Sequence, residues 1–183
     1  MSATSTSTAT STFPTRQSAP ATRTLSPQTR LWMWGWIPSF LIHDGEEALY
    51  IVRHGGLKEF GVFQTTAQCL SGILFELMIG CLAVLAATRA ARPGRAMTLF
   101  GFLMWGWTLH GVMHLAEAAS THDYAFGSVT AAPIVVTYGA LMLARLYREH
   151  LLDRRRLPLA ILGGAILGGL LIYTAHQWGS LFG

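Results

Sequence analysis

Charged residues are scarce in this sequence. Only 12% of its 183 residues are Asp, Glu, Lys or Arg, whereas 51% are hydrophobic. In an ordinary soluble domain about a quarter of the residues carry charge. The hydrophobic residues also gather in long blocks with few interruptions. The composition therefore indicates an integral membrane protein rather than a soluble domain.

Cysteine is equally sparse, and the basic residues form no continuous face. Cys69 and Cys81 lie in one hydrophobic block at a spacing unlike that of zinc or thioredoxin motifs, so we expect free, buried thiols. The net charge of +4 comes from basic residues at the ends of hydrophobic blocks, without interleaved aromatic residues. That placement predicts no nucleic-acid partner.

The first 30 residues lack both acidic residues and long apolar runs. They are rich in Ser, Thr, Ala and Pro, and such a composition buries too little apolar surface to offset the entropy of ordering the chain. We expect a disordered cytoplasmic tail over residues 1–30 and a transmembrane helical domain over residues 31–183. The tail shows neither the apolar core of a secretory signal nor the amphipathic repeat of a transit peptide, so the expected location is the bacterial inner membrane.

Five apolar blocks follow this tail. Each is close to the ~20 residues that an α-helix needs to cross a bilayer, and segments with charge, Gly or Pro separate them. The sequence therefore predicts an all-α fold, a polytopic membrane bundle of five transmembrane helices. The blocks are residues 31–52, 66–88, 96–119, 128–146 and 157–178.

Basic residues predict the orientation of these helices. If the chain crosses five times, eleven of the thirteen Lys and Arg residues fall on the side of the N-terminus, and only Arg53 and Lys58 fall on the other. Basic residues are enriched in cytoplasmic segments. We therefore expect the N-terminus inside and the C-terminus outside.

The block 31–52 contains a polar motif, His43-Asp44-Gly45-Glu46-Glu47. Even one carboxylate at the centre of a membrane helix costs about 2.5–3.5 kcal/mol, so a motif with four ionisable residues indicates a function. His43, Glu46 and Glu47 are spaced i, i+3 and i+4, which places them on one helix face. Asp44 points about 100° away from His43 and is expected to face another helix or water.

Two further blocks place His and Glu at a matching depth. His110, His114 and Glu117 share one face of the block 96–119, at spacings i, i+4 and i+7. Glu76, in the antiparallel block 66–88, lies at about the level of His43. Helices present ligands to one ion through such spacings, so we expect a metal site in the outer half of the membrane. The expected metal ligands are His43, Glu46, Glu47, Glu76, His110, His114 and Glu117.

This donor set suits a divalent metal, either zinc or a carboxylate-rich pair of iron or manganese ions. In a zinc site, Glu46 or Glu47 would be the catalytic general base. Two alternatives need no metal: a His–Glu pair that transfers protons, and a polar network that only holds the helices together. The surplus of carboxylates disfavours a bis-histidine haem.

The motif resembles that of the HXXEE-domain membrane proteins, a bacterial family of uncharacterised function. Residues 43–47 carry the H-x-x-E-E signature, and the resemblance extends to His110, His114 and the Tyr-x-x-Gly segment 124–130, where Phe126 replaces a more usual proline. It covers roughly residues 31–145 and implies a polytopic membrane protein without specifying a reaction.

Membrane CAAX-type proteases offer a weaker analogy. The pairs Glu46-Glu47 and His110-x-x-x-His114 are similar to their motifs, but Ile51 occupies the position of their arginine.

The preferred interpretation is a metal-dependent hydrolase or oxidoreductase that acts on a lipid-like or hydrophobic small molecule reaching the site from the bilayer. A proton- or cation-coupled transporter would use the same cluster as an ion pathway. A non-catalytic membrane scaffold would use it only for packing. The sequence leaves these alternatives open.

Overall fold

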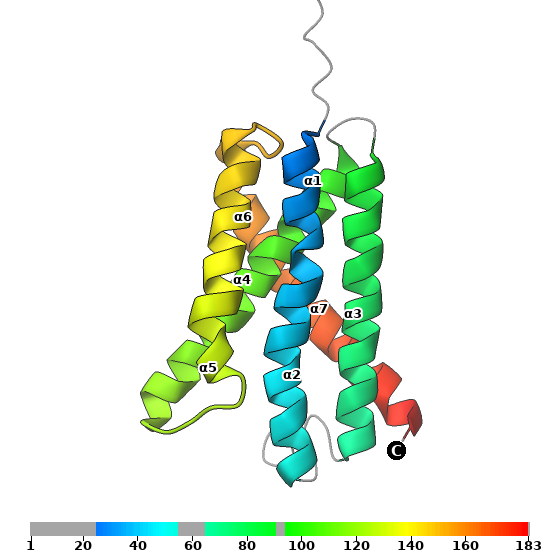
Figure 1. Cartoon of the computed structure of the whole chain (residues 1–183), viewed down its shortest axis with the longest axis vertical. Helices are drawn as coiled ribbons and strands as arrows, with labels where there is room; N and C mark the ends of the chain where they lie inside the picture. The colour runs from blue at the N-terminus through cyan, green and yellow to red at the C-terminus, as the bar shows by residue number, and fades with distance from the viewer. Residues whose placement is uncertain (1–24, 55–64, 91–93, 183) are drawn as a thin grey trace, which may run out of the picture.

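The chain folds as a bundle of helices whose long segments run in alternating directions (Figure 1). The computed structural model describes residues 25–54, 65–90 and 94–182, and these contain helices and no strand. In chain order the elements are α1 (Pro27–Trp34), α2 (Trp36–His54), α3 (Thr66–Arg89), α4 (Arg95–Thr121), α5 (Ser128–Thr130), the π-helix η2 (Ala131–Val136), α6 (Thr137–Arg148), the 3-10 helix η3 (Arg154–Arg156), α7 (Leu157–Gly179) and the 3-10 helix η4 (Ser180–Phe182).

These elements correspond to the five apolar blocks of the sequence. α1 and α2 together cover the first block, α5, η2 and α6 cover the fourth, and α3, α4 and α7 match the others. The expected all-helical architecture is therefore confirmed over the described residues. Lys58, Arg92 and the loop glycines Gly55 and Gly56 lie outside the described residues.

The first helix starts inside the stretch that was expected to be a disordered tail. Residues 1–24 lie outside the described residues, but Ser26 caps α1 by accepting a hydrogen bond from the Thr29 amide at 3.1 Å. The Thr29 hydroxyl donates to the Glu149 carboxylate at 2.6 Å, and Arg145 pairs with the same carboxylate at 2.9 Å. These contacts tie the start of α1 to the end of α6, so the helical domain begins earlier than expected.

Two prolines interrupt the helical hydrogen bonding. Proline has no N–H, and its ring clashes with the carbonyl four residues earlier. Pro38 accordingly follows the break between α1 and α2 at Gly35, and Pro133 lies within η2. The wider turn of η2 comes directly after Thr130, and such turns occur frequently at functional sites.

α4 and α7 approach each other closely at glycines. A Cβ at Gly164 would lie 2.8 Å from the Gly106 amide nitrogen, and a Cβ at Gly106 would lie 2.9 Å from the Gly164 carbonyl oxygen. Gly168, one turn along α7, faces the same glycine of α4. Small residues at this spacing permit close helix packing. The small-residue pattern of α7 therefore serves contacts within the chain.

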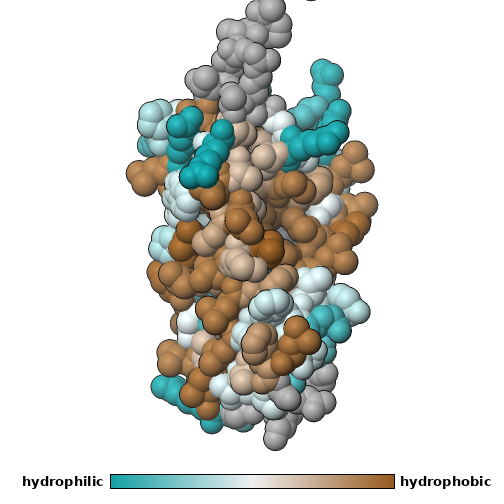
Figure 2. All heavy atoms as spheres, turned by 90° about the vertical axis from the view of Figure 1, so that its right-hand side faces the viewer, coloured by the Kyte–Doolittle hydropathy of each residue, from teal (hydrophilic) through white to brown (hydrophobic). Residues whose placement is uncertain are grey.

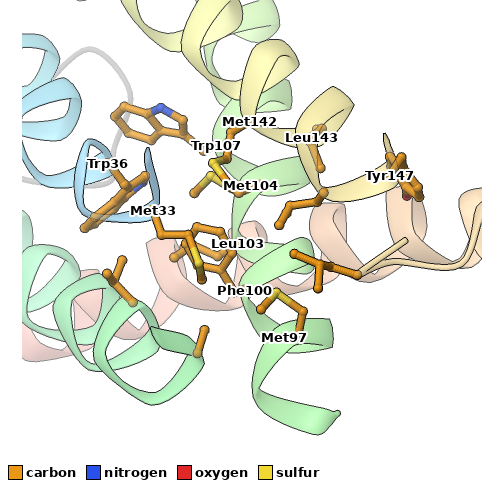
Figure 3. Packing of buried hydrophobic residues seen from close by; sticks show 14 of the residues in the cluster. Met33, Trp36, Met97, Phe100, Leu103, Met104, Trp107, Met142, Leu143 and Tyr147 are labelled. Carbon is orange, nitrogen blue, oxygen red and sulfur yellow. The ribbon is translucent and has the colours of Figure 1, made fainter. Parts of the chain in front are cut away.

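Aromatic and sulfur-containing side chains form much of the core, to which α1, α2, α3, α4 and α6 all contribute (Figure 3). Trp36, Phe40 and Trp107 make one cluster, with ring centroids 4.9 to 5.9 Å apart. Trp36 lies over Gly80 of α3, where a Cβ would collide with the indole ring. Phe40 stands three residues before His43, and Trp107 stands three residues before His110. The aromatic cluster therefore forms the floor beneath those histidines.

Apolar side chains cover much of the outer surface. Figure 2 shows them over the middle of one face, with hydrophilic side chains gathered toward its two ends. Along α7, Leu159, Leu162, Ile166 and Leu170 are all exposed. Extended apolar patches are rare on soluble monomers and mark surfaces that meet a membrane or a partner.

Three helical segments within the described residues are long and apolar enough to span a membrane: Thr66–Arg89, Ser128–Arg148 and Arg154–Phe182. α2 and α4 are not among them; the motif at residues 43–47 makes α2 less apolar, and His110, His114 and Glu117 do the same for α4. The five crossings with the N-terminus inside therefore stay a prediction.

Candidate metal centre

Four side chains of α2 and α4 converge on one point. His43 and Glu47 come from α2, His110 and His114 come from α4, and one ligand atom of each lies within 4.8 Å of the others. The histidine Nε2 atoms lie 3.3 Å (His43), 3.5 Å (His110) and 2.9 Å (His114) from Glu47 Oε1. The Nε2 atoms of His110 and His114 are 3.0 Å apart. We call these four residues the metal group.

Helix geometry creates this arrangement. Residues at i and i+4 lie one above the other, so each helix contributes one pair, His43 with Glu47 and His110 with His114. The side chain of His43 is 0% exposed, that of His114 6% and that of Glu47 10%, whereas the His110 side chain is 26% exposed. The metal group is therefore mostly buried, and His110 is its most accessible side chain.

The distances in the metal group fit a single ion. Zinc binds histidine nitrogen at ~2.0–2.1 Å and carboxylate oxygen at ~2.0–2.2 Å in a tetrahedron, which places neighbouring ligand atoms ~3.3–3.5 Å apart. The separations around Glu47 Oε1 are 2.9, 3.3 and 3.5 Å. Glu47 Oε1 and His43 Nε2 are buried and make no aligned hydrogen bond among the described residues, although the two atoms lie 3.3 Å apart. A cation would satisfy both atoms, so the metal group could hold a metal ion.

Glu46 lies outside the metal group, although the motif predicted it on the same face. Positions i+3 and i+4 differ by about 100° around the helix axis, so Glu46 turns toward α5 instead of α4. Its carboxylate accepts hydrogen bonds from the Thr130 hydroxyl (2.7 Å) and amide (2.9 Å), the Tyr124 hydroxyl (2.8 Å) and the Val129 amide (3.2 Å). These donors occupy Glu46 and leave it facing away from the group.

Thr130 connects Glu46 to the metal group. Its hydroxyl oxygen is 2.7 Å from His43 Nδ1 and 2.7 Å from Glu46 Oε2. An ionised carboxylate only accepts, so the single hydroxyl proton goes to Glu46 and the oxygen accepts from His43 Nδ1–H. The Nε2 atom of His43 is then unprotonated and directs its lone pair into the metal group. Partners of this kind fix the tautomer and orientation of metal-binding histidines.

The loop between α4 and α5 closes over the site. Gly127 has a φ of +77°, and a Cβ there would lie 2.8 Å from Glu47 Oε1 and 2.9 Å from His43 Cε1. Glycine adopts this conformation without strain and leaves room for the backbone. Burial and the hydrogen bond to Glu46 raise the pKa of Tyr124 in the same loop to about 12, so its hydroxyl remains a donor at neutral pH.

Aromatic rings enclose the imidazoles. Trp107 lies edge-on to His43 with a centroid distance of 5.4 Å and stacks on His110 at 5.9 Å. Phe126 from the loop meets His114 at 5.2 Å. These rings exclude water from two sides of the metal group, which strengthens electrostatic interactions inside it.

A cavity of about 340 Å³ lies against the metal group, and Glu47, His110 and His114 form part of its wall. Its volume is in the ~300–1,000 Å³ range of small-molecule sites. Glu76 from α3 and Glu117 from α4 line the same cavity but are not members of the metal group. Of the seven expected ligands, the structure thus gathers four and places Glu46, Glu76 and Glu117 around them.

Three residues close to the metal group were not predicted as part of the site: Thr130, Gly127 and Trp107. Thr130 and Gly127 belong to the segment 124–130 that the family resemblance included. That resemblance was the sequence feature from which their place near the site could have been predicted. Trp107 precedes His110 by one helical turn, but in a chain with six Trp residues this spacing does not distinguish it from a core residue.

The fold and the site define a helical protein with helices apolar enough to span a membrane and a buried His/Glu group that could hold a metal ion. The family model for proteins of unknown function with an HXXEE motif matches residues 34–142, more than half of the chain. The chain therefore belongs to this HXXEE family, and the resemblance inferred from the motif is confirmed. No curated protein and no solved structure matches the chain.

Proposed function

We propose that this protein is a membrane enzyme that binds one divalent metal ion through His43, Glu47, His110 and His114 and acts on a hydrophobic small molecule or lipid. The observation that carries the proposal is the convergence of three imidazole nitrogens and one carboxylate oxygen beside a cavity. In a purely structural polar network, buried groups satisfy one another's hydrogen bonds. His43 Nε2 and Glu47 Oε1 are close together but make no aligned hydrogen bond among the described residues, and this favours a bound cation instead.

The balance of buried charge supports the same proposal. Glu47 is buried among imidazoles, and an uncompensated buried carboxylate is strongly destabilising. A divalent ion would neutralise it. Three nitrogen ligands and one oxygen ligand suit zinc, iron or manganese. Only one group of this kind occurs within the described residues, which favours a single ion over a carboxylate-rich pair.

Different residues of the chain take different roles in this proposal. Glu46 acts through Thr130 to hold His43 with Nε2 toward the ion, and Glu47 serves as a ligand. Glu76 lines the same cavity as Glu47, His110 and His114, so we assign to it the general-base role first expected for Glu46 or Glu47. When bound, zinc would supply Lewis acidity for hydrolysis, and iron would supply oxidation chemistry.

The cavity also supports a hydrophobic substrate. Met113 and Ile172 line it and are 63% and 38% exposed on the outer surface. That surface is apolar, so a lipid-soluble molecule would reach the metal group from the bilayer. With the three membrane-spanning candidates, this favours a multi-pass location, for which we propose the bacterial inner membrane.

Elemental analysis of the full chain, purified in mild detergent and incubated with zinc, iron or manganese, tests the proposal. We expect one metal equivalent per chain. His110→Ala and Glu47→Gln remove a ligand and should lower the affinity by at least about 100-fold, since loss of an outer partner alone costs about 10–100-fold.

His122→Asn is the matched control for these variants. His122 is exposed in the loop after α4 with a φ of 55°, a conformation that asparagine tolerates, so this variant should bind metal as the wild type does. Folded, monodisperse wild-type protein that binds none of the three metals would refute the proposal.

A further inference from the structure

The wall of the cavity is both apolar and acidic. Its apolar part includes Ile51, Ile73, Met113, Phe126 and Ile172. Its carboxylates are Asp44, Glu47, Glu76 and Glu117. Among the described residues that line it, none is Lys or Arg. A metal ion in the metal group would compensate Glu47 and leave the other three acids without a cation.

Asp44 is the carboxylate that most needs a partner. It is only 4% exposed, and its Oδ2 atom has no hydrogen-bond partner among the described residues. A buried acceptor left unsatisfied costs about 1–3 kcal/mol, and more when it is charged. Asp44 is not a member of the metal group. Because Asp44 lines the cavity, a rotation of its carboxylate would let a molecule bound there donate the missing hydrogen bond.

These features select a ligand by its chemistry. The acids of the wall would repel a carboxylate or a phosphate, and juxtaposed like charges cost several kcal/mol. An alcohol would donate one hydrogen bond but bring no positive charge. An ammonium group carries that charge and three donors, and hydrogen bonds between ionised partners are roughly twice as strong as neutral ones. The apolar lining accommodates an alkyl body.

We propose that the cavity binds a hydrophobic molecule with a primary amine, whose ammonium group is held by Asp44 and whose alkyl chain lies between α3, α4 and α7. Glu76 and Glu117 contribute negative charge along the same wall. Glu47, His110 and His114 belong both to this wall and to the metal group, so the amine would approach the ion along them. This inference rests on the proposed function, because it specifies the substrate class of that same site.

The test uses three photoreactive probes of equal chain length: dodecylamine, dodecanol and dodecanoic acid, each with a diazirine near the far end of the chain. The full protein in lipid nanodiscs is irradiated with each probe, and labelling of the cavity residues Ile73, Met113 and Phe126 is quantified by mass spectrometry. We expect the amine to label these residues about tenfold more than the alcohol, and the acid to label them least.

Replacing Asp44, the proposed partner of the ammonium group, tests the inference further. Asp44→Asn should reduce labelling by the amine about tenfold while labelling by the alcohol stays unchanged, which also shows that the cavity is intact. Asp153→Asn, an exposed acid that caps η3 at the far end of the bundle, is the matched control and should keep the preference. Equal labelling by amine and alcohol in the wild type would overturn the proposal however Asp44→Asn behaves.

Metal content measured on the same nanodisc samples separates this inference from the proposed function. Metal-loaded protein without any preference for the amine would refute the amine site and leave the metal enzyme standing. Protein that binds no metal but shows the Asp44-dependent preference would refute the metal enzyme and support the amine site.

Discussion

Replacing Thr130 with valine tests the link between Glu46 and the metal group. Valine has nearly the shape of threonine but lacks the hydroxyl. The change removes the 2.7 Å contact to His43 Nδ1 and the 2.7 Å hydrogen bond to Glu46 Oε2. The backbone amide of residue 130 still donates to Glu46 at 2.9 Å, so the carboxylate stays in place. The perturbation is therefore confined to the orientation and tautomer of His43.

The expected loss follows from the burial of His43. Removing an outer partner of a metal-binding histidine lowers metal affinity by about 10–100-fold, which corresponds to about 1.4–2.8 kcal/mol. The His43 side chain is 0% exposed, so solvent does not replace the lost hydroxyl at Nδ1. An unsatisfied buried group costs about 1–3 kcal/mol, which agrees with this range. Thr130→Val should also lower the unfolding temperature of the metal-free protein.

A competition titration with a chromophoric chelator in detergent measures the affinity. Thr130→Ser keeps the hydroxyl and should bind metal nearly as the wild type does. Thr137→Val is the control on the same helical segment, because within the part of the chain that the structure describes the Thr137 hydroxyl donates to the Ala132 carbonyl at 2.8 Å and not to the metal group. If Thr130→Val bound metal as tightly as Thr137→Val, the proposed link through Thr130 would be refuted.

Two glycine substitutions extend these tests. Gly127→Ala should weaken metal binding and lower the unfolding temperature, because the left-handed conformation costs about 1–2 kcal/mol for a residue with a Cβ and the methyl group would press on Glu47 and His43. Gly45→Ala is the control for Gly127→Ala, because a Cβ at Gly45 would have nothing within 4 Å. Equal metal content and equal unfolding temperature in the two variants would contradict the role of Gly127. Gly164→Leu should destabilise the fold by about 1–3 kcal/mol through overpacking against α4, whereas Gly169→Leu points into open space and should not. Thermal unfolding in detergent compares this second pair, and an unchanged Gly164→Leu would argue against close packing of α4 on α7.

The helices and the pairs within the metal group could be predicted from sequence because both depend on local spacing. An apolar block of membrane length predicts a helix whatever its neighbours are. His43 with Glu47 and His110 with His114 are each four residues apart, so each pair shares a face before any packing is known. The prediction that the two faces meet rested on matching depth, and the structure brings them together.

The positions of Glu76 and Glu117 could not be predicted in the same way. Counting residues along a helix gives the depth of a side chain but not the direction in which the packed helix points it. That direction depends on contacts such as Trp36 over Gly80 and Gly106 against Gly164, which no local spacing indicates. Glu76 therefore lines the cavity beside the metal group without joining it, although its predicted depth matches that of His43.

The two glutamates of the motif differ by one position, and this difference explains why the motif needs both. Glu47, at i+4 from His43, faces α4 and completes the metal group. Glu46, at i+3, faces α5, where it fixes Thr130 and the loop that carries Gly127. In the proposed metal site, one carboxylate thus supplies a ligand atom, while the other orients the histidine of the same motif through a third residue. The backbone of Gly127 lies against both His43 and Glu47, and Glu46 binds Tyr124 and Thr130 on either side of it, so Glu46 also holds the loop that covers them.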